Sequence, residues 1–346
     1  TIRFGITERG DDVGMYTSVA VTPDGEPRVS YFDRTAGVLK FAAKVGETWQ
    51  IHVVDDGSGA GAGTAQAGVY TSLSLRSDDG RPGIAYTTYV TDGDTTTAQV
   101  WFAAAQTATP TAASDWTLFP VDSAVLPPVD EANPDPFPLP GGLGLFVDVA
   151  RGPDQAPVVV YYDRTAGDLR MSRLDPITGT FTAPQVIDGI DSDAGWSPSV
   201  TVGGDGVVHI AYVASTHEDL QYWNSATATA EIIDDGYRLV GTTEDGLPKP
   251  EFHFIGDDVT VTLIDGSPAV VYQDATTHEL VESRKGGDGL WTRETLAGNE
   301  ATFAGAYGFY AAAAQSSDKL IISTWVLDLG NEDQWVEIFE RTIGVD

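Results

Sequence analysis

The sequence contains no cysteine, few basic residues and no long apolar segment. Without cysteine, the chain has neither disulfides, nor a thiol nucleophile, nor a cysteine-based zinc site. Its 346 residues include 19 Lys and Arg against 51 Asp and Glu, a net charge of -32. Nucleic-acid binding needs clustered basic side chains, and anionic membrane surfaces attract them, so the composition argues against both partners. No run of eighteen apolar residues occurs, which excludes a membrane-spanning helix.

Familiar catalytic motifs are also missing. The chain has no Gly-x-Ser-x-Gly elbow, no phosphate-binding loop and no His-Glu-x-x-His sequence. Its five histidines are scattered, and His253 differs from the others because it lies in an insertion between repeats. We therefore keep His253 as a candidate ligand-binding residue.

What the chain does contain is an internal repeat. Each copy has a tyrosine in an apolar strand, then a turn, another strand, and an acidic Asp-Gly end. Self-similarity of this kind marks units that cannot bury their apolar faces alone. Helical periodicity is nearly absent, and Gly, Pro, Asp and Asn turns separate the short apolar segments, which is typical of strands. The copies are centred on Tyr31, Tyr86, Tyr161, Tyr212 and Tyr272, with Trp325 in the sixth position.

Four strands per repeat and six repeats predict an all-β, six-bladed β-propeller of four-stranded antiparallel blades, formed by residues 1–346 as one domain. The sixth repeat is one strand short. Residues 2–7 supply an extra strand at the other end of the chain, and we expect it to pair into the last blade and close the ring. The alternative is a seven-bladed ring, which requires a hidden sheet within residues 124–145 or 237–255.

Two long insertions interrupt the repeat. Residues 124–146 are rich in proline and acidic residues, and residues 237–256 carry Arg238, Lys249 and His253. Both lie between the last strand of one repeat and the first strand of the next, so we expect them on one rim of the propeller. Long loops in compact domains are usually functional or disordered, and we favour function here.

Several segments resemble the repeats of secreted bacterial β-propellers loosely grouped with the sialidase superfamily. They include residues 39–42, Leu-Lys-Phe-Ala, and the related stretches 14–18 and 68–72. The resemblance implies a shared scaffold. Sialidase-like propellers carry Asp-box turns, and residues 42–49 keep the Gly, Thr and Trp of that pattern. A sialidase also needs three arginines around a carboxylate and a Tyr-Glu nucleophile pair; Arg34 and Arg164 occupy equivalent loops.

Aromatic residues recur where the innermost strands begin. Tyr and Trp offer rigid apolar area with a polar handle, so a ring of them suits stacking on a sugar or gripping a peptide. The alternative is that they wedge between adjacent blades. The aligned candidates for ligand binding are Tyr16, Tyr70, Phe146, Trp196 and Tyr310.

Polar residues follow one or two positions further along the same strands, which predicts a water-lined channel. Two of them, Asp148 and Asp258, are candidate ligands for a divalent cation such as calcium, because hard cations take oxygen ligands and tolerate water in their shell. The alternative is that each carboxylate is satisfied by water and a backbone amide. The aligned residues are Ser18, Ser72, Asp148, Ser199, Asp258 and approximately Ala312.

Three functions remain open at this level. The leading hypothesis is a secreted or cell-surface protein, extracellular or periplasmic, that binds a glycan, a peptide or a partner protein through one rim. The second is a sialidase-like glycoside hydrolase or lyase that uses Asp148 and Asp258. The third is a structural module of a surface assembly. A channel carboxylate with a raised pKa beside a pocket would favour the enzyme, and exposed aromatic side chains on a shallow surface would favour binding.

Overall fold

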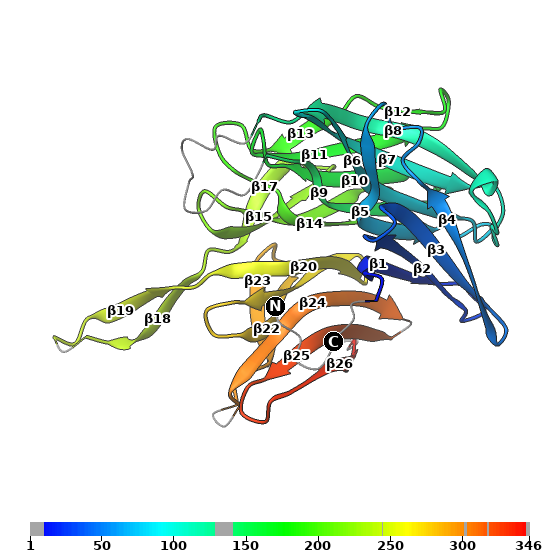
Figure 1. The fold of residues 1–346 in the computed structure, drawn as a ribbon. Coiled ribbons are helices and arrows are strands. Elements are labelled where there is room, and N and C mark those ends of the chain that lie inside the picture. Colours follow the sequence, from blue (N-terminus) through cyan, green and yellow to red (C-terminus); the bar gives the residue numbers. More distant parts are fainter. Residues whose placement is uncertain (1–9, 129–140, 244, 301–302, 317, 344–346) are drawn as a thin grey trace. The chain divides into compact units, whose positions relative to one another are not determined.

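The computed structural model describes residues 10–128, 141–243, 245–300, 303–316 and 318–343. The protein is an all-β, six-bladed β-propeller whose blades are antiparallel sheets (Figure 1), which confirms the fold class expected from the repeats. Within these ranges, no helix is long and apolar enough to cross a membrane. The chain divides into two compact units, each built mainly from three blades.

Unit 1 comprises residues 1–151, 155–165 and 171–185. Its sheets follow the chain order, with the innermost strand first in each blade. The third blade is finished by two short strands, which both pair with its third strand. The strands of its three blades are β1 (Val13–Val21), β2 (Pro27–Asp33), β3 (Val38–Val45), β4 (Thr48–Asp55), β5 (Thr64–Leu75), β6 (Pro82–Asp92), β7 (Thr95–Ala105), β8 (Trp116–Val125), β9 (Leu143–Arg151), β10 (Pro157–Asp163), β11 (Asp168–Asp175), β12 (Thr180–Phe181) and β13 (Gln185–Asp188), with a short 3-10 turn, η1 (Ala113–Asp115). Residues 168–170 of β11 and 186–188 of β13 belong to unit 2.

Unit 2 comprises residues 152–154, 166–170 and 186–346. It contains two four-stranded sheets, a three-stranded sheet and a separate hairpin. The strand expected to complete the last sheet, residues 2–7, lies outside the described residues. The strands are β14 (Trp196–Val202), β15 (Val208–Ala214), β16 (Asp219–Asn224), β17 (Thr229–Asp234), the hairpin β18 (Tyr237–Thr242) and β19 (Pro248–Phe252), β20 (Ile255–Ile264), β21 (Ser267–Asp274), β22 (Glu279–Lys285), β23 (Trp291–Ala297), β24 (Gly305–Ser316), β25 (Lys319–Asp328) and β26 (Asp333–Thr342).

The two insertions differ in what the structure shows. The segment 237–256 is mostly an ordered antiparallel hairpin, β18–β19, rather than an irregular loop. The segment 124–146 begins in β8 and ends in β9, and residues 129–140 between them lie outside the described residues.

The apolar core lies between successive blades. The second strand is the most buried strand in the third and fourth blades, where all seven residues of β10 and of β15 are buried. In the first and sixth blades, buried and partly exposed residues alternate along much of β2 and β25. One cluster joins the first and second blades through Leu39, Phe41 and Tyr86. Another joins the fourth and fifth blades through Tyr222, Val270 and Tyr272. Strands buried on both faces read as near-continuous apolar runs, and the repeat shows this pattern.

The tyrosine of the repeat links neighbouring blades through its hydroxyl group. In each case the hydroxyl donates a 2.7 Å hydrogen bond to an aspartate at the end of the preceding blade. A buried hydroxyl and a buried or half-buried carboxylate thereby satisfy each other. At the junction of the fifth and sixth blades the register places Thr324, not Trp325, at the tyrosine position, and Ala297 replaces the aspartate. The four pairs are Tyr86–Asp55, Tyr161–Asp122, Tyr212–Asp188 and Tyr272–Asp234.

Candidate functional site

All six innermost strands share one strained backbone position. Each strand has a register shift, and at that shift a residue other than glycine adopts a positive φ between 46° and 53°. Such residues are uncommon because the Cβ crowds the backbone, and they cluster at functional sites. Counting along the chain, the six residues are Tyr16, Tyr70, Phe146, Ser197, Asp258 and Tyr310.

A glycine two residues earlier in each strand makes this position possible. Gly68 has a φ of 102°, and a Cβ placed on it would lie 2.8 Å from the Cα atom of Leu39 in the preceding blade. The glycine is therefore needed both for its conformation and for the close approach of the two blades. This geometry fixes the direction of the Tyr70 side chain, two residues further along the strand.

In unit 1 the strained position carries an aromatic row, which we define as Tyr16, Tyr70 and Phe146. The ring centroids of Tyr16 and Tyr70 are 4.5 Å apart, and those of Tyr70 and Phe146 are 5.1 Å apart. Tyr16 is 37% exposed, and the other two side chains are half-buried. The structure thus brings together three of the aromatic residues that the sequence predicts as ligand-binding.

The electrostatics keep this row neutral. Burial, and secondly the neighbouring Tyr16, raises the pKa of Tyr70 to about 12, although Arg164 opposes the shift. Burial also raises the pKa of Tyr89 beside them. Both phenols therefore remain protonated at neutral pH, and the surface offers apolar rings with hydroxyl groups and no negative charge of its own.

In unit 2 the same position is mostly polar. Ser197 occupies it in the fourth blade, so Trp196 is one residue away and packs, half-buried, against the apolar cluster around Tyr222. In the fifth blade Asp258 accepts a 2.8 Å hydrogen bond from the backbone N–H of Tyr310, which holds the position in the sixth blade. Tyr310 is 76% exposed.

The polar layer behind this position joins adjacent innermost strands. The hydroxyl oxygens of Ser18, Ser72 and Ser199 each accept a hydrogen bond from a backbone N–H of the next innermost strand, at 3.0, 3.2 and 3.1 Å. In unit 1, Asp148 Oδ1 accepts bonds from the Ser72 hydroxyl and from the Val149 N–H. These groups connect adjacent blades, and Ser72 and Ser199 are buried.

Asp148 and Asp258, the predicted metal ligands, occupy different places in the repeat. The register aligns Asp148 with Ser18 and Thr260, whereas Asp258 stands at the strained position. In the described part of the chain, no group of three or more acidic, histidine or cysteine side chains is placed to hold a metal ion. The calcium site remains a prediction.

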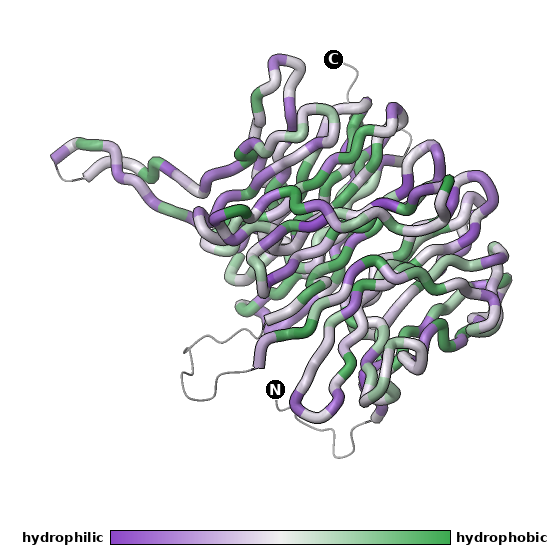
Figure 2. The backbone as a smooth tube through the Cα atoms, turned by 90° about the horizontal axis from the view of Figure 1, so that it is seen from above, coloured by the Kyte–Doolittle hydropathy of each residue, from purple (hydrophilic) through white to green (hydrophobic). Residues whose placement is uncertain are grey.

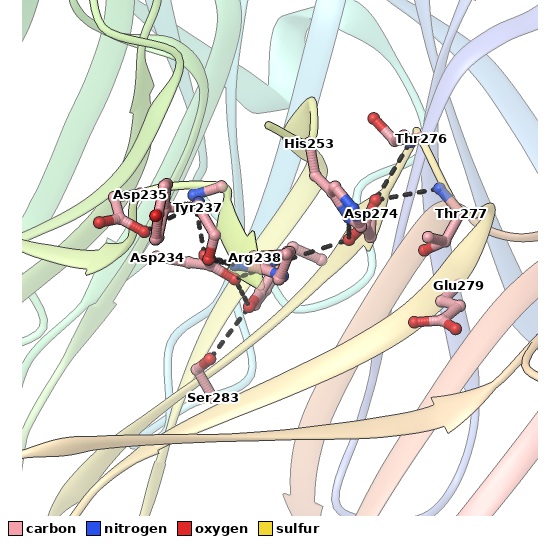
Figure 3. Close-up of polar contacts among 12 residues, drawn as sticks. Asp234, Asp235, Tyr237, Arg238, His253, Asp274, Thr276, Thr277, Glu279 and Ser283 are labelled. Atoms are coloured by element: carbon pink, nitrogen blue, oxygen red, sulfur yellow. Dashed lines mark hydrogen bonds and ion pairs between the residues drawn. The ribbon is translucent and has the colours of Figure 1, made fainter. Parts of the chain in front are cut away.

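His253 lies in a buried ionic cluster of unit 2, at the base of the β18–β19 hairpin (Figure 3). Its Nδ1 atom is 2.7 Å from Asp274 Oδ2, and the side chains are 7% and 0% exposed. Arg238 donates two hydrogen bonds to Asp234, at 2.8 and 2.7 Å, and lies 3.8 Å from Asp274. Each strand of the hairpin is thus attached to a carboxylate of an adjacent blade.

Opposing effects set the charge of Asp234. Its burial raises the pKa, but the hydrogen bonds from Arg238 and Tyr272 outweigh burial and leave the pKa below its ordinary value of 3.8. Asp234 is therefore ionised at neutral pH and pairs with a charged guanidinium. The geometry is bidentate, which is the strong form of this interaction.

Arginines elsewhere are held in separate local contacts. Arg151 donates to the backbone oxygen of Gln155 at 2.6 Å and lies 5.3 Å from the ring centre of Phe102, and burial lowers its pKa to about 10. Arg76 pairs with Asp78, and Arg34 with Asp12 at the surface.

A shallow pocket of about 480 Å³ lies on the last blade of unit 2. Asp328 in its wall already accepts hydrogen bonds from the backbone of Gly330 and Asn331, so this carboxylate serves its own turn. The pocket is lined by Glu300, Phe303, Tyr307, Asp328, Gly330 and Asn331.

Comparison with known proteins shows the fold. No protein-family model matches the chain, and no curated protein matches it. Among solved structures, a protein of unknown function from Dyadobacter fermentans has 14% identity and a TM-score of 0.56, with 97% of this chain and 96% of that chain covered. The Trypanosoma rangeli sialidase in complex with 2,3-difluorosialic acid has 11% identity and a TM-score of 0.50.

The match to the sialidase covers 96% of this chain but 55% of that one, so this chain spans about half of the sialidase's length. At such low identity the similarity supports the β-propeller scaffold alone. It agrees with the scaffold resemblance seen in the sequence.

Proposed function

We propose that this protein is a binding propeller that recognises a neutral glycan through the aromatic row of unit 1. The observation that carries the proposal is the repeated use of a strained backbone position to present three aromatic side chains in contact. Strain at one residue has many causes, but the same strain at three adjacent strands, each time with an aromatic ring, supports a shared surface.

The chemistry of the row suits a sugar. Aromatic rings present an apolar face to the C–H groups of a sugar, while phenol hydroxyls hydrogen-bond to its hydroxyl groups. Tyr16 and Tyr70 provide both kinds of contact. The net charge of -32 repels anionic ligands, so neutral sugars fit better than sialic acid or sulfated chains.

The carboxylates favour binding over hydrolysis. Asp148 accepts hydrogen bonds from Ser72 and from the Val149 N–H, and Asp258 accepts one from the Tyr310 N–H. These bonds join each carboxylate to the adjacent innermost strand, which supports a structural role for both. We therefore propose a non-catalytic role. An extracellular or periplasmic location is also part of the proposal, on composition alone.

The test is calorimetric titration with neutral oligosaccharides of glucose, galactose, mannose, xylose and arabinose, with sialyllactose as a charged comparison. Binding of at least one neutral oligosaccharide is expected. Tyr70→Ala should weaken that binding about tenfold or more, since a central aromatic contact is worth at least about 1.4 kcal/mol.

Trp49→Ala is the matched control. Trp49 is an aromatic residue of the same unit, 49% exposed, but on the outermost strand β4, and its loss should leave the affinity unchanged. Circular dichroism checks folding, and the more exposed Tyr16→Ala replaces Tyr70→Ala if the latter fails to fold. Failure of every neutral oligosaccharide to bind, or equal losses in the row and control variants, would overturn the proposal.

A further inference from the structure

The hairpin β18–β19 forms an arm, which we define as residues 237–243 and 245–252. Tyr237 lies opposite Phe252 and Leu239 opposite Pro250 in its antiparallel register. The arm extends from the blades of unit 2, with apolar segments along it (Figures 1 and 2). A free two-stranded ribbon is marginally stable in water, so an arm of this kind usually rests on something.

The arm has one uncharged face. Successive side chains of a strand point to opposite faces, so Tyr237 and Leu239 share a face with Pro250 and Phe252. Arg238 and its register partner Glu251 point the other way. The side chains of Tyr237, Leu239 and Phe252 are 44%, 59% and 69% exposed. Sheets normally bury an apolar face, but no other part of the described chain covers this one.

The base of the arm is fixed. Arg238 on β18 is bound by Asp234, and His253, the residue after β19, is bound by Asp274. Two polar attachments, one on β18 and one directly after β19, hold the arm in a set direction relative to the fourth and fifth blades. A surface that is already ordered loses less conformational entropy when it binds.

We propose that the uncharged face of the arm packs against the same face of a second copy of this chain, which gives a two-fold symmetric dimer. A two-fold interface needs a self-complementary surface, and an apolar face without charged side chains meets that need. Each copy carries a charge of -32, so surfaces elsewhere repel each other, whereas the arm projects from the blades (Figure 1) and its uncharged face adds no charge to the contact. A basic partner would instead be drawn to the acidic surface.

The size and edges of the arm also fit this arrangement. Its uncharged face carries three exposed large apolar side chains, Tyr237, Leu239 and Phe252. Together they present roughly 300–400 Å², compared with about 800 Å² per partner in a standard interface. The dimer should therefore be weak and depend on concentration. Pro248 and Pro250 have no N–H group, which makes the β19 edge a poor template for strand addition and favours packing through the face.

Sedimentation equilibrium over a wide concentration range, at low and high sodium chloride, tests the proposal. We expect monomer at the lowest concentrations, dimer at the highest, and a tighter dimer in high salt because salt screens the repulsion between the acidic bodies. Leu239→Lys should weaken the dimer at least about tenfold by placing a charge in the apolar interface.

Val240→Lys is the matched control, because it makes the same change at the next residue, which points to the opposite face and is 43% exposed. This variant should dimerise like the unsubstituted protein. A protein that stays monomeric at every concentration and salt level would overturn the proposal. So would equal effects of the two lysine variants, or no effect of Leu239→Lys.

A second measurement locates the contact. The chain has no cysteine, so Glu251→Cys on the charged face gives a single site for a nitroxide label. Electron-spin dipolar spectroscopy should show one narrow intermolecular distance in the dimer; a dimer without it would contradict packing of the arms. Retention of oligosaccharide binding in Leu239→Lys would show that this site is independent of the aromatic row.

Discussion

The two units share a backbone but use it differently. Both place a strained residue at the same bulge in each innermost strand. Unit 1 fills the position with Tyr16, Tyr70 and Phe146, which contact one another. Unit 2 fills it with Ser197, Asp258 and Tyr310, of which Asp258 is bonded to the backbone of Tyr310.

The units also differ at the end of the fourth strand. In unit 1, the carboxylate of Asp55 accepts hydrogen bonds from the Tyr86 hydroxyl and from a backbone N–H of its own turn. In unit 2, the equivalent Asp234 additionally binds Arg238 of the arm. The shared residues account for the fold, and the departures from the repeat create surfaces. Candidate functional residues are therefore expected at the positions where one unit departs from the repeat and the other follows it.

The largest expected effect concerns the ionic attachment found in unit 2. Arg238→Ala leaves the buried carboxylate of Asp234 without its cation and should lower the free energy of unfolding by about 3–5 kcal/mol. Chemical denaturation measures it. Arg34→Ala in unit 1 removes an exposed pair, whose side chains are 63% and 58% exposed, and should change stability by less than about 1 kcal/mol. Similar losses of unfolding free energy in both variants would contradict the expected difference between the buried and the exposed ion pair.

A smaller effect is expected for the tyrosine that both units use. Tyr86→Phe removes a buried hydrogen bond to Asp55 and should cost about 1–3 kcal/mol. Tyr272→Phe should cost less, because Arg238 continues to satisfy Asp234. Chemical denaturation of the two variants gives their losses of unfolding free energy. A larger loss in Tyr272→Phe would show that Arg238 does not satisfy the Asp234 carboxylate on its own.

The smallest effect concerns the strained position itself. Tyr310 is 76% exposed, so Tyr310→Gly loses little packing and relieves a backbone conformation that costs other residues about 1 kcal/mol or more. We expect a slightly higher melting temperature. Tyr70→Gly should lower it, because the half-buried ring packs against Tyr16 and Phe146. If both variants lose stability equally, strain is not what distinguishes this position.

The sequence predicts the fold well because the residues that repeat are those that become buried between blades. The buried tyrosine and the aspartate that accepts its hydroxyl recur with the strands that carry them, and strand count follows from the turns. The sixth repeat is harder, because Thr324 and Ala297 replace this pair and only the strand register reveals the equivalence.

The candidate site was predictable in part. Three aromatic residues of unit 1 were found by alignment on the innermost strands, but the same alignment selects Trp196 in place of Ser197. The glycine two residues earlier, Gly195 in this blade, is the signal that would have given the right position. The pairing of His253 with Asp274 has no such signal, since the two residues are 21 positions apart and the pairing of β20 with β21 brings them together.

The most direct test of the account is a crystal structure of the protein with a bound neutral oligosaccharide selected by calorimetry. We expect a sugar ring in contact with Tyr16, Tyr70 and Phe146, with hydroxyl groups of the sugar hydrogen-bonded to the tyrosine phenols. An oligosaccharide that binds specifically elsewhere and leaves these three side chains untouched would contradict it.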